Sequence, residues 1–174
     1  EKDSSAKKKS DKSKSKESSS SDDEAVLEDE SAYYGSGDSN DYLTDVHTYT
    51  NDMHPYSMSI PNRFEMEDTP SGSSTRYEDP ETGFVISLSG YVNVNDETAH
   101  EMFVDEDTSG KADLYTAEGD NWYVVSWREG DTITYTKTIV TDSTVATASL
   151  EYSTANRDMG SKIIDKLLPT FQVD

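Results

Sequence analysis

The sequence contains no cysteine and no long apolar run. Without cysteine, the 174-residue chain has no disulfide framework, no thiolate nucleophile and no cysteine-ligated zinc. No apolar stretch approaches the roughly 18 residues that a membrane-spanning helix requires. The sequence also lacks a Gly-x-Ser-x-Gly elbow, a phosphate-binding loop and a dinucleotide fingerprint. We therefore predict that the protein is not an enzyme.

Positive charge is scarce and unevenly distributed, and the formal net charge is −21. Residues 1–20 hold seven of the 15 basic residues, and residues 21–52 hold none. The rest of the chain has eight basic residues against 22 acidic ones. Such an acidic body repels phosphate backbones, because nucleic-acid binding depends on neutralising them with Lys and Arg. We expect no nucleic-acid partner.

The composition changes near residue 50. Residues 1–52 consist almost entirely of Ser, Lys, Asp, Glu, Gly and Asn, whose few apolar atoms cannot offset the entropy of ordering the chain. We predict a disordered linker there, first rich in Ser and Lys and then acidic, with a span of about 40 Å. Residues 53–174 alternate apolar and polar residues between turn signals, which predicts one folded domain.

Period-two alternation within this domain predicts a series of strands. They cover residues 54–60, 84–94, 112–117, 121–127, 131–140 and 144–152. A short helix is expected to begin after a cap at Asn95 or Asp96, and a longer one to cover residues 154–168 and pack on the sheet. The pattern predicts an α+β fold with a single antiparallel sheet, a meander in its C-terminal half, flanked by helices.

Two short turns fix the register that we expect in the meander. If Glu129-Gly130 and Asp142-Ser143 are two-residue loops, then Arg128 faces Asp131 and Thr141 faces Thr144. One face of the sheet then carries apolar residues: Trp122, Val124, Ile133, Tyr135, Ile139, Ala146, Ala148, Leu150 and Tyr152. The other face carries threonines with an aromatic end.

That second face supplies the predicted ligand site, which consists of Tyr123, Trp127, Thr132 and Thr134. Trp and Tyr combine a large contact area with a polar group, so they suit an exposed binding platform. The alternative is that the helix near residues 96–103 or the first hairpin covers these side chains.

Calcium is the one cofactor for which the sequence offers a candidate site. Asp105, Asp107 and Asp113 stand at positions 1, 3 and 9 of a possible calcium loop that also has the required glycine, Gly110. Position 12 is Thr116, where such a loop needs a bidentate acid. The alternative interpretation is a solvated acidic turn.

Histidine chemistry has little support in the sequence. His100-Glu101 begins like the helix motif of zinc proteases, but no second histidine follows at the required spacing. A hydrolase would need an enclosed pocket around His54 or His100.

The order of these motifs resembles the PsbP-like superfamily. The residues that carry the resemblance are Tyr56, Ile60, Pro61, Phe64, residues 121–126, Tyr135, Thr136, Lys137, residues 150–152 and Phe171. The resemblance covers residues 53–174 and implies an antiparallel sheet flanked by helices. Members range from an accessory subunit of the oxygen-evolving photosystem to a Ran-binding nuclear-import factor, so it implies binding rather than catalysis. No functional residue of the family transfers to this sequence.

Some bacterial members of this superfamily are envelope lipoproteins with a serine-rich linker after a lipid-modified cysteine. The resemblance therefore implies a non-enzymatic module on the extracellular face of the bacterial cell envelope, attached to the membrane only through a lipid anchor. We expect this module to be a monomer. We expect its partner to be a protein or a cell-wall component. The alternative is a calcium-dependent adhesion or signalling domain.

Overall fold

The structure is a computed structural model that describes residues 41–67 and 72–174. The predicted linker lies outside the described residues as far as residue 40. The described chain forms ten strands, three α-helices and two 3₁₀ helices. None of the helices in this part of the chain is long and apolar enough to cross a membrane.

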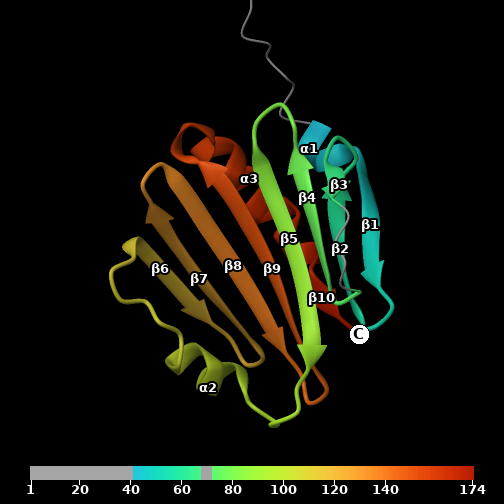
Figure 1. Ribbon diagram of the computed structural model, residues 1–174, viewed down its shortest axis with the longest axis vertical. Coiled ribbons are helices and arrows are strands. Elements are labelled where there is room, and N and C mark those ends of the chain that lie inside the picture. The colour runs from blue at the N-terminus through green and yellow to red at the C-terminus, as the bar shows by residue number, and fades with distance from the viewer. Residues whose placement is uncertain (1–40, 68–71) are drawn as a thin grey trace, which may run out of the picture. The chain divides into compact units, whose positions relative to one another are not determined.

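Seven strands form one antiparallel sheet, which is the broad layer in Figure 1. Its spatial order is β3-β4-β5-β9-β8-β7-β6, so the last four strands form the predicted meander. The bounds are β3 Glu65–Glu67, β4 Ser74–Asp79, β5 Phe84–Val92, β6 Ala112–Glu118, β7 Trp122–Glu129, β8 Thr132–Val140 and β9 Thr144–Ser153.

The prediction of a single sheet was wrong, because three further strands form a second sheet. Strand β2 (Tyr56–Pro61) lies in its centre and pairs antiparallel with β1 (Val46–Asn51) and β10 (Gln172–Val173). The composition of β1 is polar and resembles the linker, so alternation did not reveal it. This strand also lies before residue 53, where we expected the domain to begin, and a short helix α1 (Asp41–Thr44) precedes it.

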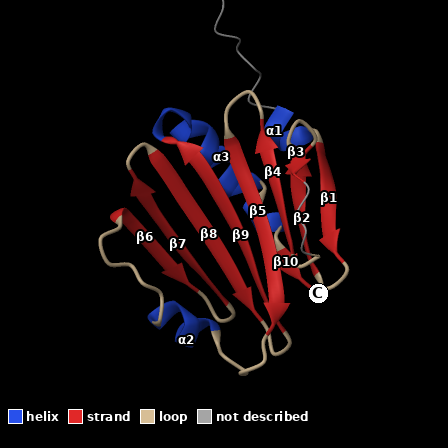
Figure 2. Cartoon of the chain, in the orientation of Figure 1, coloured by secondary structure: helices blue, strands red, loops and turns tan. Residues whose placement is uncertain are grey.

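Different elements cover the two faces of the large sheet. Figure 2 shows α3 behind the sheet and α2 at its lower end. The face that we call the core face packs against α3 (Arg157–Lys166) and the three-stranded sheet in the larger apolar cluster. The opposite face, the α2 face, packs against α2 (Ala99–Val104) in a smaller cluster. The predicted division of side chains is confirmed: Leu150 and Tyr152 belong to the larger cluster, whereas Tyr123 and Val125 belong to the smaller one.

The register of the meander agrees with the prediction at one turn and differs at the other. Thr141 N donates to Thr144 O at 2.8 Å, which confirms that pair. At the β7–β8 turn the loop is Gly130-Asp131, and Arg128 pairs with Ile133 instead of Asp131. Gly130 provides the positive φ of 58° that the first position of a tight hairpin favours. Because the shift moves each partner by two residues, every side chain keeps its predicted face.

The short helix α2 begins one turn later than expected. Thr98 is its N-cap: Glu101 N donates to Thr98 Oγ1 at 3.2 Å, and Thr98 N donates to Glu101 Oε2 at 2.9 Å. This reciprocal capping box satisfies two backbone donors at the helix start. Asn95 and Asp96, the predicted caps, lie in the preceding turn, where Asp96 has a positive φ of 55°.

The C-terminal helix lies close to the sheet at Gly160. A Cβ atom at this position would lie 2.4 Å from two ring atoms of Tyr152, which is itself buried. The predicted helix over residues 154–168 is confirmed, with a 3₁₀ turn at each end, η2 (Thr154–Asn156) and η3 (Leu168–Thr170). Its stability therefore comes from contact with the sheet, since an interior glycine costs about 1 kcal/mol relative to alanine.

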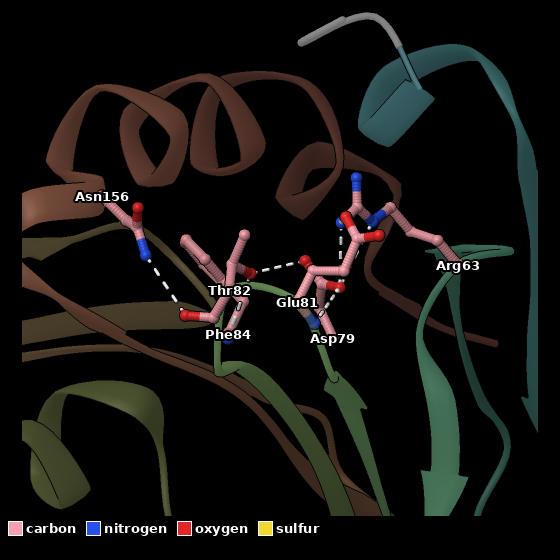
Figure 3. A network of polar contacts seen from close by, with 6 residues as sticks. All are labelled: Arg63, Asp79, Glu81, Thr82, Phe84 and Asn156. Atoms are coloured by element: carbon pink, nitrogen blue, oxygen red, sulfur yellow. Dashed lines mark hydrogen bonds and ion pairs between the residues drawn. The ribbon is translucent and has the colours of Figure 1, made fainter. Parts of the chain in front are cut away.

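A buried carboxylate at the end of β4 joins three segments of the chain (Figure 3). Asp79 is fully buried, and its Oδ1 accepts hydrogen bonds from Arg63 Nη2 at 3.1 Å and Glu81 N at 3.2 Å. Thr82 Oγ1 donates to Asp79 Oδ2, and Asn156 Nδ2 donates to the Thr82 carbonyl. The network holds the segment before β3, the β4–β5 turn and the start of the C-terminal helix together.

Candidate functional site

The four residues predicted as a ligand platform do not form an exposed surface. Tyr123 is 6% exposed and belongs to the cluster under α2. Trp127 is half-buried against the same cluster, and Thr134 is its half-buried neighbour on β8. Only Thr132, at the start of β8, is exposed. The structure thus shows the alternative arrangement, in which the short helix covers the aromatic end of this face.

Tyr123 is held as a neutral phenol beneath this helix. Burial raises the pKa of Tyr123 to about 12, and its hydroxyl donates to Glu106 Oε1 at 3.0 Å. A tyrosine in the unfolded chain ionises at a pKa of about 10. The folded state therefore keeps its proton to higher pH, and the stability that Tyr123 contributes is present below pH 10 and lost between pH 10 and about 12.

We expect the urea midpoint of the full chain to fall as the pH rises from about 10 to 12. Tyr123→Phe should make this fall smaller, because phenylalanine has no proton to lose, whereas Tyr115→Phe at an exposed site is the matched control. Urea denaturation at a series of pH values measures both. Identical pH profiles for wild type and Tyr123→Phe would contradict the assignment.

The three predicted calcium ligands have different partners in the structure. Asp113 Oδ2 accepts from Arg128 Nε at 2.6 Å, so this carboxylate faces a cation. Asp107 accepts from the backbone and hydroxyl of Ser109, and Asp105 is the C-cap of α2. Across residues 41–67 and 72–174, no group of three acidic or histidine side chains is placed to hold a metal ion.

The histidines considered for hydrolysis do not form an enclosed pair. His100 is on the exposed side of α2, and its Nδ1 lies 2.7 Å from Glu118 Oε1. His54 is half-buried in the β1–β2 turn. A hydrogen bond at the surface does not provide the enclosed environment that acid–base catalysis needs.

A groove lies on the core face between α3 and the outer strands β6, β7 and β8. It consists of two clefts, of about 250 Å³ and about 190 Å³, which share Tyr135. The first cleft is lined by Asp113, Tyr115, Ser126, Trp127, Arg128, Ile133, Tyr135, Tyr152, Arg157 and Ser161, so one predicted ligand-site residue, Trp127, borders it. The second is lined by Trp122, Val124, Tyr135, Lys137, Ile164, Leu168 and Pro169. We call the two clefts together the α3 groove.

One wall of the first cleft is built by an irregularity in the edge strand. The register of β6 against β7 shifts between Ala112 and Tyr115, and Asp113 has a positive φ of 51°. Aspartate tolerates this conformation better than most residues, and a bulge re-aims the side chains next to it. Here the carboxylate meets the guanidinium of Arg128, which also donates to the Gly130 carbonyl at 2.9 Å.

Three tyrosines, Tyr115, Tyr135 and Tyr152, line the first cleft. Burial raises the pKa of Tyr135, and the proximity of Tyr115, Asp165 and Tyr152 raises it further. Burial also raises the pKa of Tyr152, against the opposing effect of Arg157. These two phenols therefore stay protonated near neutral pH and can donate hydrogen bonds. Tyr115, from the edge strand, is 55% exposed at the rim.

The second cleft is mainly apolar and carries one cation. Lys137 Nζ lies 5.8 Å from the centre of the Trp122 ring, within the range of a cation–π contact. Burial lowers the pKa of Lys137. The half-buried side chains of Trp122 and Ile164 face the cleft from β7 and α3, beside Pro169. A planar apolar group of a ligand could pack against these side chains.

The α3 groove concentrates positive charge in an acidic protein. Arg128, Arg157 and Lys137 line it, which is three of the eight basic residues after residue 52. Trp122 and Tyr135 were predicted to be packing residues on the apolar face, without a ligand. The groove could not be predicted because its two arginines come from different elements and lie 29 positions apart in the sequence. The scarcity of basic residues was the only signal available.

Comparisons with known proteins identify the class of fold. No family model matches the sequence, and no curated protein matches it significantly. Among solved structures, the solution structure of cyanobacterial PsbP (CyanoP) from Synechocystis sp. PCC 6803 matches with a TM-score of 0.59 and 15% sequence identity. The match covers 76% of this chain and 94% of that one. The protein has a PsbP-like fold, which confirms that part of the sequence-based resemblance.

Proposed function

We propose that the protein is a non-enzymatic binding module that holds its ligand in the α3 groove. The observation that carries the proposal is the gathering of Arg128, Arg157 and Lys137 with aromatic rings in one groove of a chain whose net charge is −21. Clefts that bind ligands combine apolar and aromatic walls with a few placed polar groups. The α3 groove has this composition, whereas Tyr123 on the opposite face is already covered by α2.

We further propose a setting for this module at the extracellular face of the bacterial cell envelope. The support is the resemblance to envelope lipoproteins of the PsbP-like superfamily and the Ser- and Lys-rich composition of residues 1–20. In this proposal a lipid anchor upstream of the linker tethers a monomeric domain, and the partner is a protein or a cell-wall component. The acidic body would keep the domain away from anionic surfaces.

The test compares the binding of two matched variants of the full chain to isolated envelope fractions. Arg157→Glu introduces an acid at an exposed position of the α3 groove, and Thr132→Glu introduces one at an exposed position of the α2 face. We expect Arg157→Glu to reduce the retained protein at least about tenfold, since a reversed charge repels what the native charge attracts. Thr132→Glu should bind like the wild type. Sedimentation with the fractions and quantitative immunoblotting provide the measurement.

The expected difference depends on both variants being folded. Their circular dichroism spectra and melting temperatures should match those of the wild type, because both positions are exposed. Equal retention of all three proteins, or loss only with Thr132→Glu, would show that the α3 groove is not the binding site.

A further inference from the structure

We infer that the α3 groove recognises a small ligand in which one singly charged anionic group, a carboxylate or a phosphodiester, is joined to an apolar ring. This inference rests on the proposed function and specifies its ligand. The anionic group would occupy the first cleft, beside Arg128 and Arg157, and the ring would occupy the second, beside Trp122 and Ile164.

Arg157 provides the strongest argument for an anion. It is exposed at the first position of α3, where a positive charge opposes the helix dipole. Within residues 41–67 and 72–174, no carboxylate lies within ion-pair distance of it, although acidic residues outnumber basic ones. Arg157 therefore presents to the cleft a guanidinium without an ion-pair contact in the described chain, although its charge also acts on Asp113. Guanidinium groups bind carboxylates and phosphates with paired, charge-assisted hydrogen bonds.

Charge balance in the first cleft indicates a single negative charge on the ligand. Arg128 and Arg157 contribute two positive charges, and Asp113 neutralises one of them through its 2.6 Å contact with Arg128. One positive charge remains. That same contact and the bond to Gly130 hold the guanidinium of Arg128 in place with only part of its five N–H donors used. The protonated phenols of Tyr135 and Tyr152 add donors to the same cleft.

The lining of the second cleft is the reason for inferring an apolar ring in the ligand. It is lined by Trp122, Ile164, Leu168 and Pro169, with Tyr135 as the residue shared with the first cleft. Strand β8 passes along both clefts from Ile133 to Lys137, which corresponds to about 13 Å at the usual rise of a strand. A ligand that uses both clefts therefore needs an anionic end and an apolar end separated by a short connection.

The inference is tested by calorimetric titration of the full chain with three probes of similar shape. These are 3-phenylpropionate, methyl phenyl phosphate and the neutral 3-phenylpropanamide. We expect at least one anionic probe to bind and the amide to bind at least about tenfold more weakly, since it cannot form charge-assisted bonds to the guanidinium groups. Binding of the carboxylate alone or of the phosphodiester alone identifies the anion. Equal binding of the amide, or no binding of either anion, would overturn the inference.

Two variants of α3 locate the site. Arg157→Gln should weaken binding of the anionic probe at least about tenfold. Lys166→Gln removes an exposed charge from the same helix outside the residues lining the groove, and should leave the affinity unchanged. Unchanged affinity in Arg157→Gln would also overturn the inference. If Arg157→Glu abolishes envelope binding while no anionic probe binds, the ligand class is wrong and the binding function stands. If envelope binding is unaffected as well, both proposals fail.

Discussion

Replacing Asp79 with alanine should lower the free energy of unfolding by about 3–5 kcal/mol. The carboxylate is fully buried and accepts hydrogen bonds from Arg63, from Glu81 N and from the Thr82 hydroxyl. Alanine removes the acceptor, so the Arg63 guanidinium, whose side chain is 21% exposed, loses its buried counter-charge and keeps the exposed one of Glu81. Breaking a buried pair by removing one partner is costly because the remaining charge stays desolvated. Urea denaturation of the full chain measures the difference.

The matched control is the second carboxylate of the same network. The Glu81 side chain is 77% exposed although it also contacts Arg63. Glu81→Ala should therefore cost about 1 kcal/mol or less, as exposed ion pairs do. If Asp79→Ala does not fold, Asp79→Asn provides the measurement, since asparagine keeps the shape and one acceptor. A similar cost for the variants at positions 79 and 81 would show that burial of the network has no energetic role.

Replacing Gly160 with alanine should destabilise the protein by about 1–3 kcal/mol, although alanine is the better helix former. Helix propensity alone predicts a gain of about 1 kcal/mol from this substitution. The new methyl group, however, would lie 2.4 Å from the ring of Tyr152, which is buried in the core and has little room to move. The sign of the change therefore separates the effect of packing from that of propensity. Thermal and urea denaturation report it.

A double-mutant cycle tests the cause of this destabilisation. In a Tyr152→Leu background the ring is absent, so Gly160→Ala should cost less than it does in the wild type, with a coupling of about 1 kcal/mol or more. Asp165→Ala, at an exposed position of the same helix, should be neutral or slightly stabilising, since the acid lies near the negative end of the helix dipole. A stabilising Gly160→Ala would show that α3 can move away from the sheet.

The position of α3 also determines the shape of the groove. The close approach at Gly160 sets the helix beside Tyr152 on β9, and the neighbouring Ser161 lines the first cleft. Because Arg157 lies one turn before Gly160 on the same helix, a displaced helix would also move that guanidinium. We therefore expect variants at Gly160 to weaken ligand binding as well as stability. The likeness to cyanobacterial PsbP concerns the fold alone and provides no ligand for this groove.

Much of the large sheet could be predicted from the sequence. The strands from β5 to β9 alternate apolar and polar residues, and a period of two directly assigns side chains to faces. The turn at Asp142-Ser143 correctly predicted the pairing of Thr141 with Thr144. The β7–β8 turn lies one residue later than predicted, but each side chain of these strands still lies on its predicted face of the sheet. Local patterns of this kind survive errors in turn position because a shift of two residues preserves the alternation.

The second sheet and the groove could not be predicted in the same way. Strand β2 pairs with β10 at the far end of the chain, and no local pattern records such a distant partner. The two residues of β10 are too few to show a period. Similarly, Trp122 and Tyr135 face the apolar side as predicted, but only the position of α3 on the sheet decides that they line a groove rather than the closed core.

The sequence by itself determined that this protein has an acidic, cysteine-free domain with an antiparallel meander and two distinct sheet faces. Composition and period-two alternation are local properties, and each residue contributes to them independently of the fold. Only the tertiary structure decided that α2 covers Tyr123, that Asp113 pairs with Arg128, and that Arg157 remains without a carboxylate partner among the described residues. Those outcomes depend on which elements meet in space, because charge and burial at a site are set by neighbours distant in the chain.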